Sequence, residues 1–580
     1  MSKTSLLSSQ KKWAGIACLT LLLAWVPQGA WGEPVTTIRN NGDSANRVDV
    51  AILGDGYTAS ELGKYATDVE TFIQGFFAQE PFNEYQRYFN VHRVDVTSNQ
   101  SGADHPELNP PVSVDTALDA TYNCGGIQRL ICVNISKVNG VVSSSLSSDR
   151  RDVILVIVND TVYGGSGGAV AVASVNSAAV ELILHEEGHS FGLLADEYGG
   201  PPPPSCNSSV EPPEVDATMQ TQREQIKWNS WISPSTPVPT TGTAAGVPGL
   251  YEGAKYCDTG LYRPTYNSKM RSLNRPFEQI NSEQLVKRVY NWVSPIDASE
   301  PSDSTVTLTQ GQNQTFMVQV PQPSTHSLNI AWKVDGQTMG TSAGFTLISS
   351  SLTLGSHTVE VTVSDPTPLV RNDSAGVLKE SRTWSANVIP GAFTLTVTMR
   401  GSGPGTVTSA PAGISCTVPG TCTTNFTSGT AVTLTEAPGS GASFKSWGGA
   451  CSGTATTCTL TLTANQSVTA TFSQLFTDPT LTARSTLLKA VHVTELRSAI
   501  NTLRAGNGLA AFGWTDATLT TGTTPAKKVH LDELRTALTQ AYQAAGQSAP
   551  SYTDPTLVAG STVIKATHIS ELRTAVRALE

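Results

Sequence analysis

The sequence predicts a multidomain protein with an α/β domain, two small β-sandwich-type domains and a helical repeat tail. Strand-like and helix-like segments alternate as far as residue 294, which is typical of an α/β domain. Short runs rich in valine and threonine follow as far as residue 473, and a repeat occupies the remainder. The 580 residues suffice for about three to five domains.

Composition excludes one broad class of function. The chain has 37 basic and 47 acidic residues, which gives a formal net charge of −10, and it contains no basic stripe. Nucleic-acid binders need such a stripe because contacts with phosphates supply much of their affinity. We therefore expect no nucleic-acid partner.

An N-terminal signal peptide is predicted over residues 1–32. Three lysines precede an apolar run over residues 13–26, and Ala30 and Gly32 place small residues at positions −3 and −1 of a cleavage site. The run is shorter than the about 20 residues of a membrane span. We expect cleavage after Gly32 and a secreted, extracellular protein, with the periplasm or the cell surface as alternative locations.

The cysteines agree with export. Cys18 lies in the predicted signal peptide, which leaves eight of the nine cysteines in the mature chain. An even number of cysteines in an exported chain predicts disulfides. Their positions suggest four neighbouring pairs: Cys124/Cys132, Cys206/Cys257, Cys416/Cys422 and Cys451/Cys458.

Residues 33–294 are predicted to form the α/β domain. Apolar runs predict buried strands at 47–53, 152–158 and 169–174. Apolar residues near a 3.6-residue period predict a helix at about 60–77, and a second helix is expected over 177–191. Alternation of this kind favours a sheet covered by helices.

The next segments predict two small β domains. Residues 294–304 contain Pro295, Pro301 and several acids, a composition that predicts a linker. Alternating strand patterns predict an immunoglobulin-like β-sandwich over 303–390. Residues 391–473 repeat that texture with many glycines and the last four cysteines, and we interpret them as a bacterial β-repeat domain with disulfides.

The tail, residues 474–580, contains three 38-residue repeats. Each repeat has one histidine followed by a Glu-Leu-Arg block, at His492, His530 and His568. Thr494, Asp532 and Ser570 stand just before those blocks and are predicted to cap a helix in each repeat. We interpret the repeated histidines as structural, because repeat units reuse local packing, and the tail as a spacer or attachment module.

The main chemical signal lies in the second predicted helix, where the chain reads His185-Glu186-Glu187-Gly188-His189. Residues four apart share a helix face, so the imidazoles of His185 and His189 can bind one metal ion. Glu186 can accept a proton from water at that ion and later deliver it to a leaving amine. The helix is apolar on most sides and therefore buried, which disfavours two solvated histidines without a function.

A third ligand is expected from the segment after Gly192, a residue that lets the chain turn away from the helix. The spacing His-Glu-x-x-His-x-x-Gly-x-x-His would place a histidine at position 195, which is Ala195. We favour Asp196, because a carboxylate completes a site of two histidines and one acid with an open position. Glu197 is the alternative ligand, or else it has a structural role.

Five motifs occur in an order that identifies a family resemblance: LGDGYT (53–58), NVHRVDV (90–96), YGGSGG (163–168), HEEGHSFGLLADEY (185–198) and the segment 262–271. With them, residues 48–293 resemble the IgA-peptidase family of bacterial zinc metallopeptidases. The resemblance implies a metzincin-like fold, one catalytic Zn²⁺ and endopeptidase activity. It also implies His185 and His189 as ligands, Glu186 as the base and Asp196 as the acidic partner. Met270 matches the methionine of a turn under the metal, although Ser268 stands where the family often has a cysteine.

Other polar residues are further candidates. Tyr198, Tyr262 and Tyr266 can each donate a hydrogen bond to a developing oxyanion, or be core or rim aromatics. Ser166 lies in a Gly-x-Ser-x-Gly pattern, but a serine-hydrolase elbow needs a helix next, and a strand is expected there. We interpret these glycines as a tight turn or as the start of an edge strand that binds an extended peptide. Pro201–Pro204 is expected to form a stiff surface loop beside the cleft.

The sequence therefore favours a secreted zinc endopeptidase that hydrolyses extracellular proteins or peptides. The alternative is a surface adhesin or scaffold with an inactive peptidase domain, in which residues 300–580 bind a cell-surface or matrix ligand. A serine hydrolase that uses Ser166 is a third hypothesis. We expect a monomer.

Overall fold

In the computed structural model, which describes residues 32–200 and 206–580, the α/β domain is built on a six-stranded sheet. In spatial order the strands are β1 (Val35–Arg39), β3 (Phe89–Val94), β2 (Val48–Asp55), β4 (Val153–Val158), β6 (Ala171–Ser174) and β5 (Gly165–Ser166). The four inner strands are parallel, and both outer strands are antiparallel to their neighbours. Inner strands that are covered on both faces explain the continuous apolar runs in the sequence.

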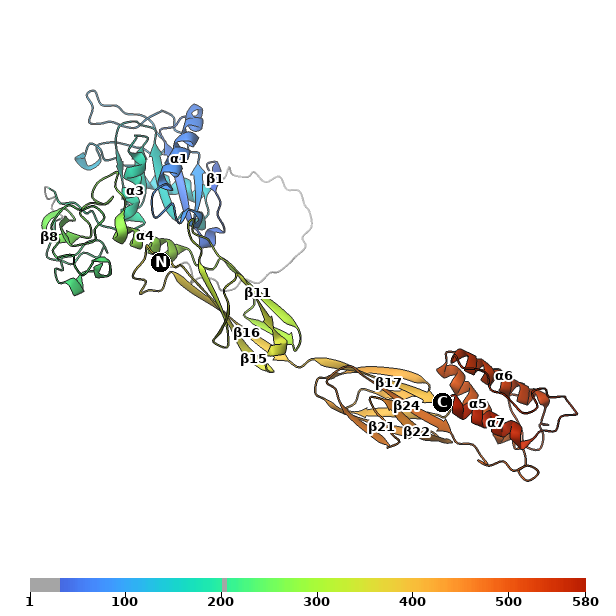
Figure 1. Cartoon of the computed structure of the whole chain (residues 1–580). Coiled ribbons are helices and arrows are strands. Elements are labelled where there is room, and N and C mark those ends of the chain that lie inside the picture. Colours follow the sequence, from blue (N-terminus) through green and yellow to red (C-terminus); the bar gives the residue numbers. More distant parts are fainter. Residues whose placement is uncertain (1–31, 201–205) are drawn as a thin grey trace. The chain divides into compact units, whose positions relative to one another are not determined.

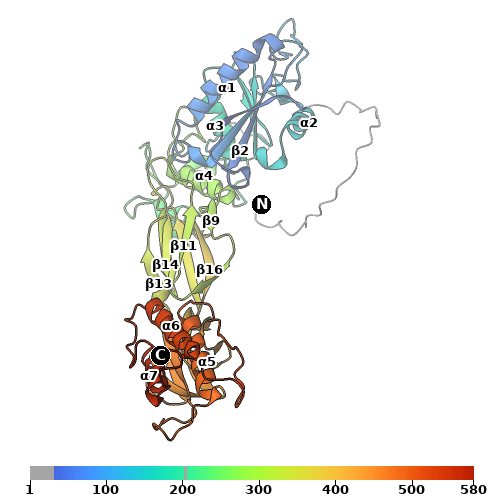
Figure 2. The same cartoon turned by 90° about the vertical axis from the view of Figure 1, so that its right-hand side faces the viewer.

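Helices cover both faces of this sheet, and the domain therefore has three layers (Figure 1). Helices α1 (Leu62–Phe76) and α3 (Ala179–Ser190) lie on one side of β2, and α2 (Ile135–Ser145) lies on the other (Figure 2). Successive side chains of a strand point to opposite faces. Thus Val50 and Ile52 belong to the core that contains α1 and α3, whereas Ala51 and Leu53 belong to the core that contains α2.

The C-terminal part of the domain adds a hairpin and a fourth helix. The hairpin consists of β7 (Tyr251–Ala254) and β8 (Cys257–Arg263), and helix α4 spans Glu278–Trp292. Apolar residues of α4 join the same core as α1 and α3. Residues 1–31 of the predicted signal peptide and the predicted Pro201–Pro204 loop lie outside the described residues. None of the helices in the described part of the chain has the length and apolar character that a membrane span requires.

The first β-sandwich begins earlier than the sequence predicts. The segment 294–304 was expected to be a linker, but Ala298–Glu300 forms strand β9 and pairs with β11. One sheet has the order β10-β16-β15-β12-β13, and the other has the order β14-β11-β9. The remaining strands are β10 (Thr305–Thr309), β11 (Asn313–Gln319), β12 (Asn329–Val334), β13 (Gln337–Gly340), β14 (Gly344–Ile348), β15 (Gly355–Ser364) and β16 (Lys379–Ile389).

The second β domain consists of two four-stranded sheets, with the orders β20-β17-β24-β22 and β19-β18-β21-β23. The strands are β17 (Ala392–Gly401), β18 (Gly405–Ala410), β19 (Ser415–Thr417), β20 (Gly420–Thr427), β21 (Ala431–Pro438), β22 (Ala442–Gly449), β23 (Thr457–Thr461) and β24 (Gln466–Gln474). All four predicted disulfides are confirmed: Cys124–Cys132, Cys206–Cys257, Cys416–Cys422 and Cys451–Cys458.

Each repeat of the tail contributes one helix: α5 (Ala490–Gly506), α6 (Lys528–Ala544) and α7 (Ala566–Ala578). The predicted caps Thr494, Asp532 and Ser570 are wrong, because the capping residues are Lys489, Lys527 and Lys565, each five residues earlier. Instead, each repeated histidine sits in the first helical turn and its Nδ1 accepts a hydrogen bond from the backbone of the capping lysine. Its Nε2 bonds an aspartate of the same repeat, as in His568 with Asp554 at 2.8 Å. These contacts agree with a structural role for the histidines.

Arginines link the three repeats into a closed ring. Arg497 donates to the backbone of the second repeat at Thr515 and Asp516, and Arg535 donates in the same way to the third. Arg573 of the third repeat donates to the carbonyl oxygens of Thr477 and Asp478 in the first, both at 2.8 Å. The tail is therefore a closed unit rather than an open array with two exposed ends.

Because the ring is closed, Arg573 of the last repeat links two repeats in the same way as Arg535 does. We expect Arg573→Met and Arg535→Met to destabilise the tail similarly, by about 2 kcal/mol each, since each loses two hydrogen bonds from a charged group. Urea unfolding of the full chain, read by hydrogen exchange in α5–α7, measures both. An open array would instead tolerate Arg573→Met and be weakened by Arg535→Met alone.

Candidate metal centre

Helix α3 places two imidazoles on one face. His185 and His189 are one turn apart, their ring planes are nearly perpendicular at 88°, and their Nε2 atoms are 3.3 Å apart. The helix itself is held by the buried residues Leu182, Ile183 and Leu184. Burial of these apolar side chains against the sheet fixes the rotation of the helix and so the direction of both imidazoles.

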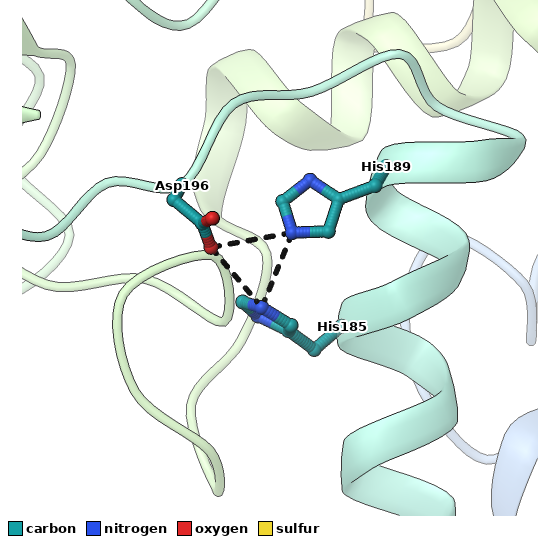
Figure 3. A group of neighbouring side chains, drawn as sticks. All are labelled: His185, His189 and Asp196. Atoms are coloured by element: carbon teal, nitrogen blue, oxygen red, sulfur yellow. Dashed lines mark hydrogen bonds and ion pairs between the residues drawn. The ribbon is translucent and has the colours of Figure 1, made fainter. Parts of the chain in front are cut away.

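The chain turns back after α3 and brings Asp196 to the histidines (Figure 3). Its Oδ1 lies 3.3 Å from His185 Nε2 and 3.2 Å from His189 Nε2. The turn does not use Gly192 as expected, because the left-handed backbone belongs to Leu193, at φ 56°. Gly192 is needed for close approach, since a Cβ there would lie 2.6 Å from the Gly188 carbonyl oxygen.

The second nitrogen of each ring fixes its tautomer. His185 Nδ1 lies 2.9 Å from the Lys269 carbonyl oxygen, and His189 Nδ1 lies 2.8 Å from that of Leu194. A carbonyl oxygen only accepts, so each Nδ1 carries a proton, and Nε2 is the nitrogen that faces Asp196. In the neutral ring, this Nε2 presents a lone pair. Backbone carbonyls commonly orient metal-ligating histidines in this way.

These three side chains fit a metal ion. Among the described residues, these three form the group whose potential ligand atoms lie close enough together to hold one metal ion. Asp196 Oδ1 is buried, and apart from the two imidazoles it has no hydrogen-bond donor. Burial lowers the pKa of His189, but the Asp196 carboxylate outweighs that effect and raises it to about 9. A bound cation would take the place of the proton that this pair otherwise shares. The separations of 3.2–3.3 Å match the edges of a tetrahedron with the zinc–ligand distances of about 2.0–2.1 Å.

Glu186 lies beside this group. A Cβ at Gly167 would come within 2.1 Å of Glu186 Oε2, so the carboxylate packs directly against the backbone of that glycine. Burial raises the pKa of Glu186, and the charges of His185 and His189 oppose the shift. A carboxyl group with a raised pKa close to two potential ligands is suited to exchange protons with a bound water.

Tyr256 orients Asp196, a contact that the sequence analysis missed. Its hydroxyl donates to Asp196 Oδ2, which leaves Oδ1 for the histidines. Lys255 and Tyr256 form the two-residue turn of the β7–β8 hairpin, and both have positive φ, at 47° and 62°. Such a turn normally contains asparagine or glycine, so Lys-Tyr gave no hairpin signal.

Two buried acids hold the backbone on either side of Asp196. Asp216 accepts the Ala195 amide with both carboxylate oxygens, at 2.9 and 3.1 Å. Glu197 accepts from Ser268 and Asn281, each at 2.8 Å, and is not among the three residues that come together at the histidines. The structure thus brings Asp196, and not Glu197, to the imidazoles. Asp216 was not anticipated, because no motif links it to the site.

The remaining candidate residues, Met270 and the three tyrosines, lie in different surroundings. Met270 is fully buried, and a Cβ at Gly188 would lie 2.3 Å from its sulfur, so it packs beneath the helix between the two histidines. The ring of Tyr198 packs against Tyr256, with 5.3 Å between centroids. The ring of Tyr266 lies near Tyr251, Arg263 and Arg271, and the backbone of Tyr262 pairs with Thr218.

Ser166 is part of the sheet edge. Its hydroxyl donates to the Ile131 carbonyl, and strand β6 follows it rather than a helix. The outer edge of β5 is already occupied at Gly165, which exchanges backbone hydrogen bonds with Arg129 and Ile131. Of the two interpretations of the glycines, the strand is therefore present, and its partner at Gly165 is a loop of the same chain.

Two family models match parts of the chain. The IgA Peptidase M64 model matches residues 36–245, which include both histidines and Asp196. The Divergent InlB B-repeat domain model matches residues 395–475 in the second β domain. The resemblance to the IgA-peptidase family is therefore confirmed, and the protein combines a peptidase domain with a B-repeat-like domain.

The solved structures that match are too dissimilar to support an interpretation of this chain. The Bacillus anthracis TIE protein is 10% identical with a TM-score of 0.19, over 34% of this chain and 45% of that chain. The fibronectin(III)-like modules of Clostridium thermocellum CbhA are 6% identical with a TM-score of 0.12, over 31% of this chain and 93% of the modules. A search of the curated proteins finds no match.

The buried acids predict a pH dependence of stability in the metal-free protein. Burial raises the pKa of Asp216, so this group favours folding at low pH and loses that contribution as pH rises through its folded pKa. We expect Asp216→Asn, which stays neutral, to lose less stability than the parent protein between pH 5 and 8. Thermal unfolding in a chelator measures this, with the exposed Glu224→Gln as control. If Asp216→Asn lost as much stability between pH 5 and 8 as the parent protein does, Asp216 would not be the source of the pH dependence.

Proposed function

We propose that this protein is a secreted zinc-dependent endopeptidase in which His185, His189 and Asp196 hold the metal and Glu186 is the general base. The observation that carries the proposal is the convergence of three potential ligand atoms at 3.2–3.3 Å beside a buried glutamate. The match of residues 36–245 to a peptidase family supports it. The four disulfides suggest an extracellular protein.

Each residue has a defined part in peptide hydrolysis. When bound, zinc supplies the Lewis acidity that activates water and polarises the scissile carbonyl group. Glu186 takes the proton of the attacking water on a carboxylate oxygen and transfers it to the nitrogen of the leaving amine. Tyr256 keeps Asp196 oriented by donating to Oδ2. Tyr198 is our candidate to donate to the oxyanion, because its ring contacts Tyr256.

The edge beyond β5 suggests how an extended substrate binds. Gly165 is paired with the loop 129–131, but Gly167 lies further along the chain and directly against Glu186. A peptide that continues the sheet at Gly167 would bring its backbone past the glutamate. Residues 300–580 would bind a cell-surface or matrix ligand and keep the peptidase near its substrates.

Substitution of the base tests the catalytic proposal. We expect Glu186→Gln to retain one zinc per chain and to cleave unfolded protein about 10²–10⁴-fold more slowly, since only proton transfer is lost. Zinc analysis and a peptide-library assay measure the two effects, with Glu224→Gln as a matched surface control. Full activity in Glu186→Gln, or inhibition by a serine-directed phosphonate but not by a chelator, would refute the mechanism. A parent protein without proteolytic activity would favour the adhesin alternative.

A second pair of variants tests the third ligand. We expect Asp196→Ala to lower zinc affinity by at least tenfold, because it removes a ligand atom. Glu197→Gln should retain zinc, since glutamine can still accept from Ser268 or Asn281. Competition with a chromophoric chelator measures both affinities. The reverse ranking of the two variants would identify Glu197 as the ligand.

A further inference from the structure

The first β-sandwich shares buried polar contacts with the α/β domain. Asp365 at the end of β15 is fully buried and accepts from Tyr85 and Tyr290 of the α/β domain, each at 2.7 Å. It also accepts from His326 at 2.6 Å and from the Thr367 amide at 2.8 Å, both in the sandwich. A buried carboxylate is tolerated only while its donors remain in place. Separation of the two domains would remove half of these donors.

The loop 365–378, which connects β15 to β16, also supplies apolar residues to the core of the α/β domain. Leu378 is a buried member of the core cluster that contains α3 and α4. Leu369, Val370 and Val377 pack against the same cluster. The loop therefore completes a hydrophobic core that the preceding domain does not close alone.

Arg371 in this loop contacts α4 and a neighbouring turn. Its amide donates to Glu283 of α4 at 2.9 Å, and its guanidinium lies 4.1 Å from the centre of the Trp231 ring. Trp231 Nε1 donates to the same Glu283 carboxylate, which Lys287 also contacts at 2.6 Å. The loop thus fixes one side of α4.

Another face of α4 holds residues 191–197, the segment that follows α3. Arg288 donates to the Phe191 carbonyl at 2.7 Å, and Gln284 donates to the Gly192 carbonyl at 3.0 Å. Asn281 donates to Glu197 at 2.8 Å. Both ends of the segment that contains Asp196 are therefore anchored on one helix.

The chain segment that leads into the sandwich is also held by hydrogen bonds. Asp297 accepts from Arg47 at 2.6 Å and from Asn46 at 2.7 Å, both in the α/β domain. Glu380 of β16 accepts the Ile296 amide at 3.0 Å. These contacts explain why residues 294–297 are part of the folded structure, although the composition of 294–304 predicts a linker.

We propose that the first β-sandwich is a positioning part of the peptidase, in which loop 365–378 holds α4 and α4 holds the segment that carries Asp196. The functional peptidase then comprises residues 33–389 rather than 33–294. Asp365 and Arg371 are positioning residues that contact neither metal nor substrate. The proposal rests on the proposed function through the assignment of Asp196 as a ligand.

Two variants of the full chain test the proposal, each with a matched control. Asp365→Asn is paired with Asp335→Asn, because Asp335 accepts from His357 and Thr358 entirely within the sandwich. Arg371→Ala keeps the backbone amide that donates to Glu283 and removes the guanidinium from Trp231, the residue that donates to the same carboxylate. It is paired with Arg382→Ala, because Arg382 lies over Trp384 within the sandwich at 5.5 Å. Arg371 is exposed, so its variant remains informative if Asp365→Asn does not fold.

Cobalt(II) affinity and visible absorption are measured below the unfolding temperature of every variant, together with hydrogen exchange of residues 191–197 in the metal-free protein. We expect both test variants to bind cobalt about tenfold more weakly and to exchange faster at 191–197, and both controls to match the parent. Lower thermal stability with unchanged cobalt affinity and exchange would reduce the sandwich to a stabilising module and overturn the proposal. If the parent binds no cobalt, the proposed metal site fails, and the exchange at 191–197 alone decides the positioning role.

Discussion

Two imidazole nitrogens and one carboxylate oxygen meet at 3.2–3.3 Å in this protein, and much of the surrounding structure serves to keep them there. Bringing three such groups together costs desolvation and side-chain freedom, which the surrounding contacts must offset. Carbonyl groups fix both imidazoles, and Tyr256 fixes the carboxylate. Buried Asp216 and Glu197 hold the backbone on both sides of Asp196, although their own burial opposes ionisation. The supports outnumber the three groups that they hold.

The local part of this site could be predicted from the sequence. Helical spacing alone places His185 and His189 on one face, and the turn after Gly192 limits the third member of the group to a few positions. The supports could not be predicted, because they come from distant segments without a motif. Tyr256 reaches Asp196 from a hairpin whose turn residues are atypical, and Asp216 contacts only a backbone amide. Tertiary contacts of this kind leave no periodic pattern in the sequence.

Composition and local propensity also misplaced two boundaries. Proline and acidic residues suggested a linker at 294–304, yet β-pairing and the ion pair between Arg47 and Asp297 outweigh that tendency. In the tail, good capping residues stand inside the helices, because the first turn is instead closed by a histidine that contacts both the backbone and an aspartate. In both cases long-range or repeat-specific contacts override a weak local preference.

The matched family region ends at residue 245, whereas the physical unit around His185, His189 and Asp196 extends further. Met270 lies beneath α3, and α4 anchors the segment that follows α3. Asp365 accepts hydrogen bonds from residues of both the α/β domain and the β-sandwich. A buried charge with donors in two domains penalises their separation more strongly than an apolar contact of similar size, because each lost donor leaves the carboxylate less solvated. The limits of the structural unit around α3 therefore follow from where buried charges find their partners, and this is why we propose the first β-sandwich as part of the peptidase.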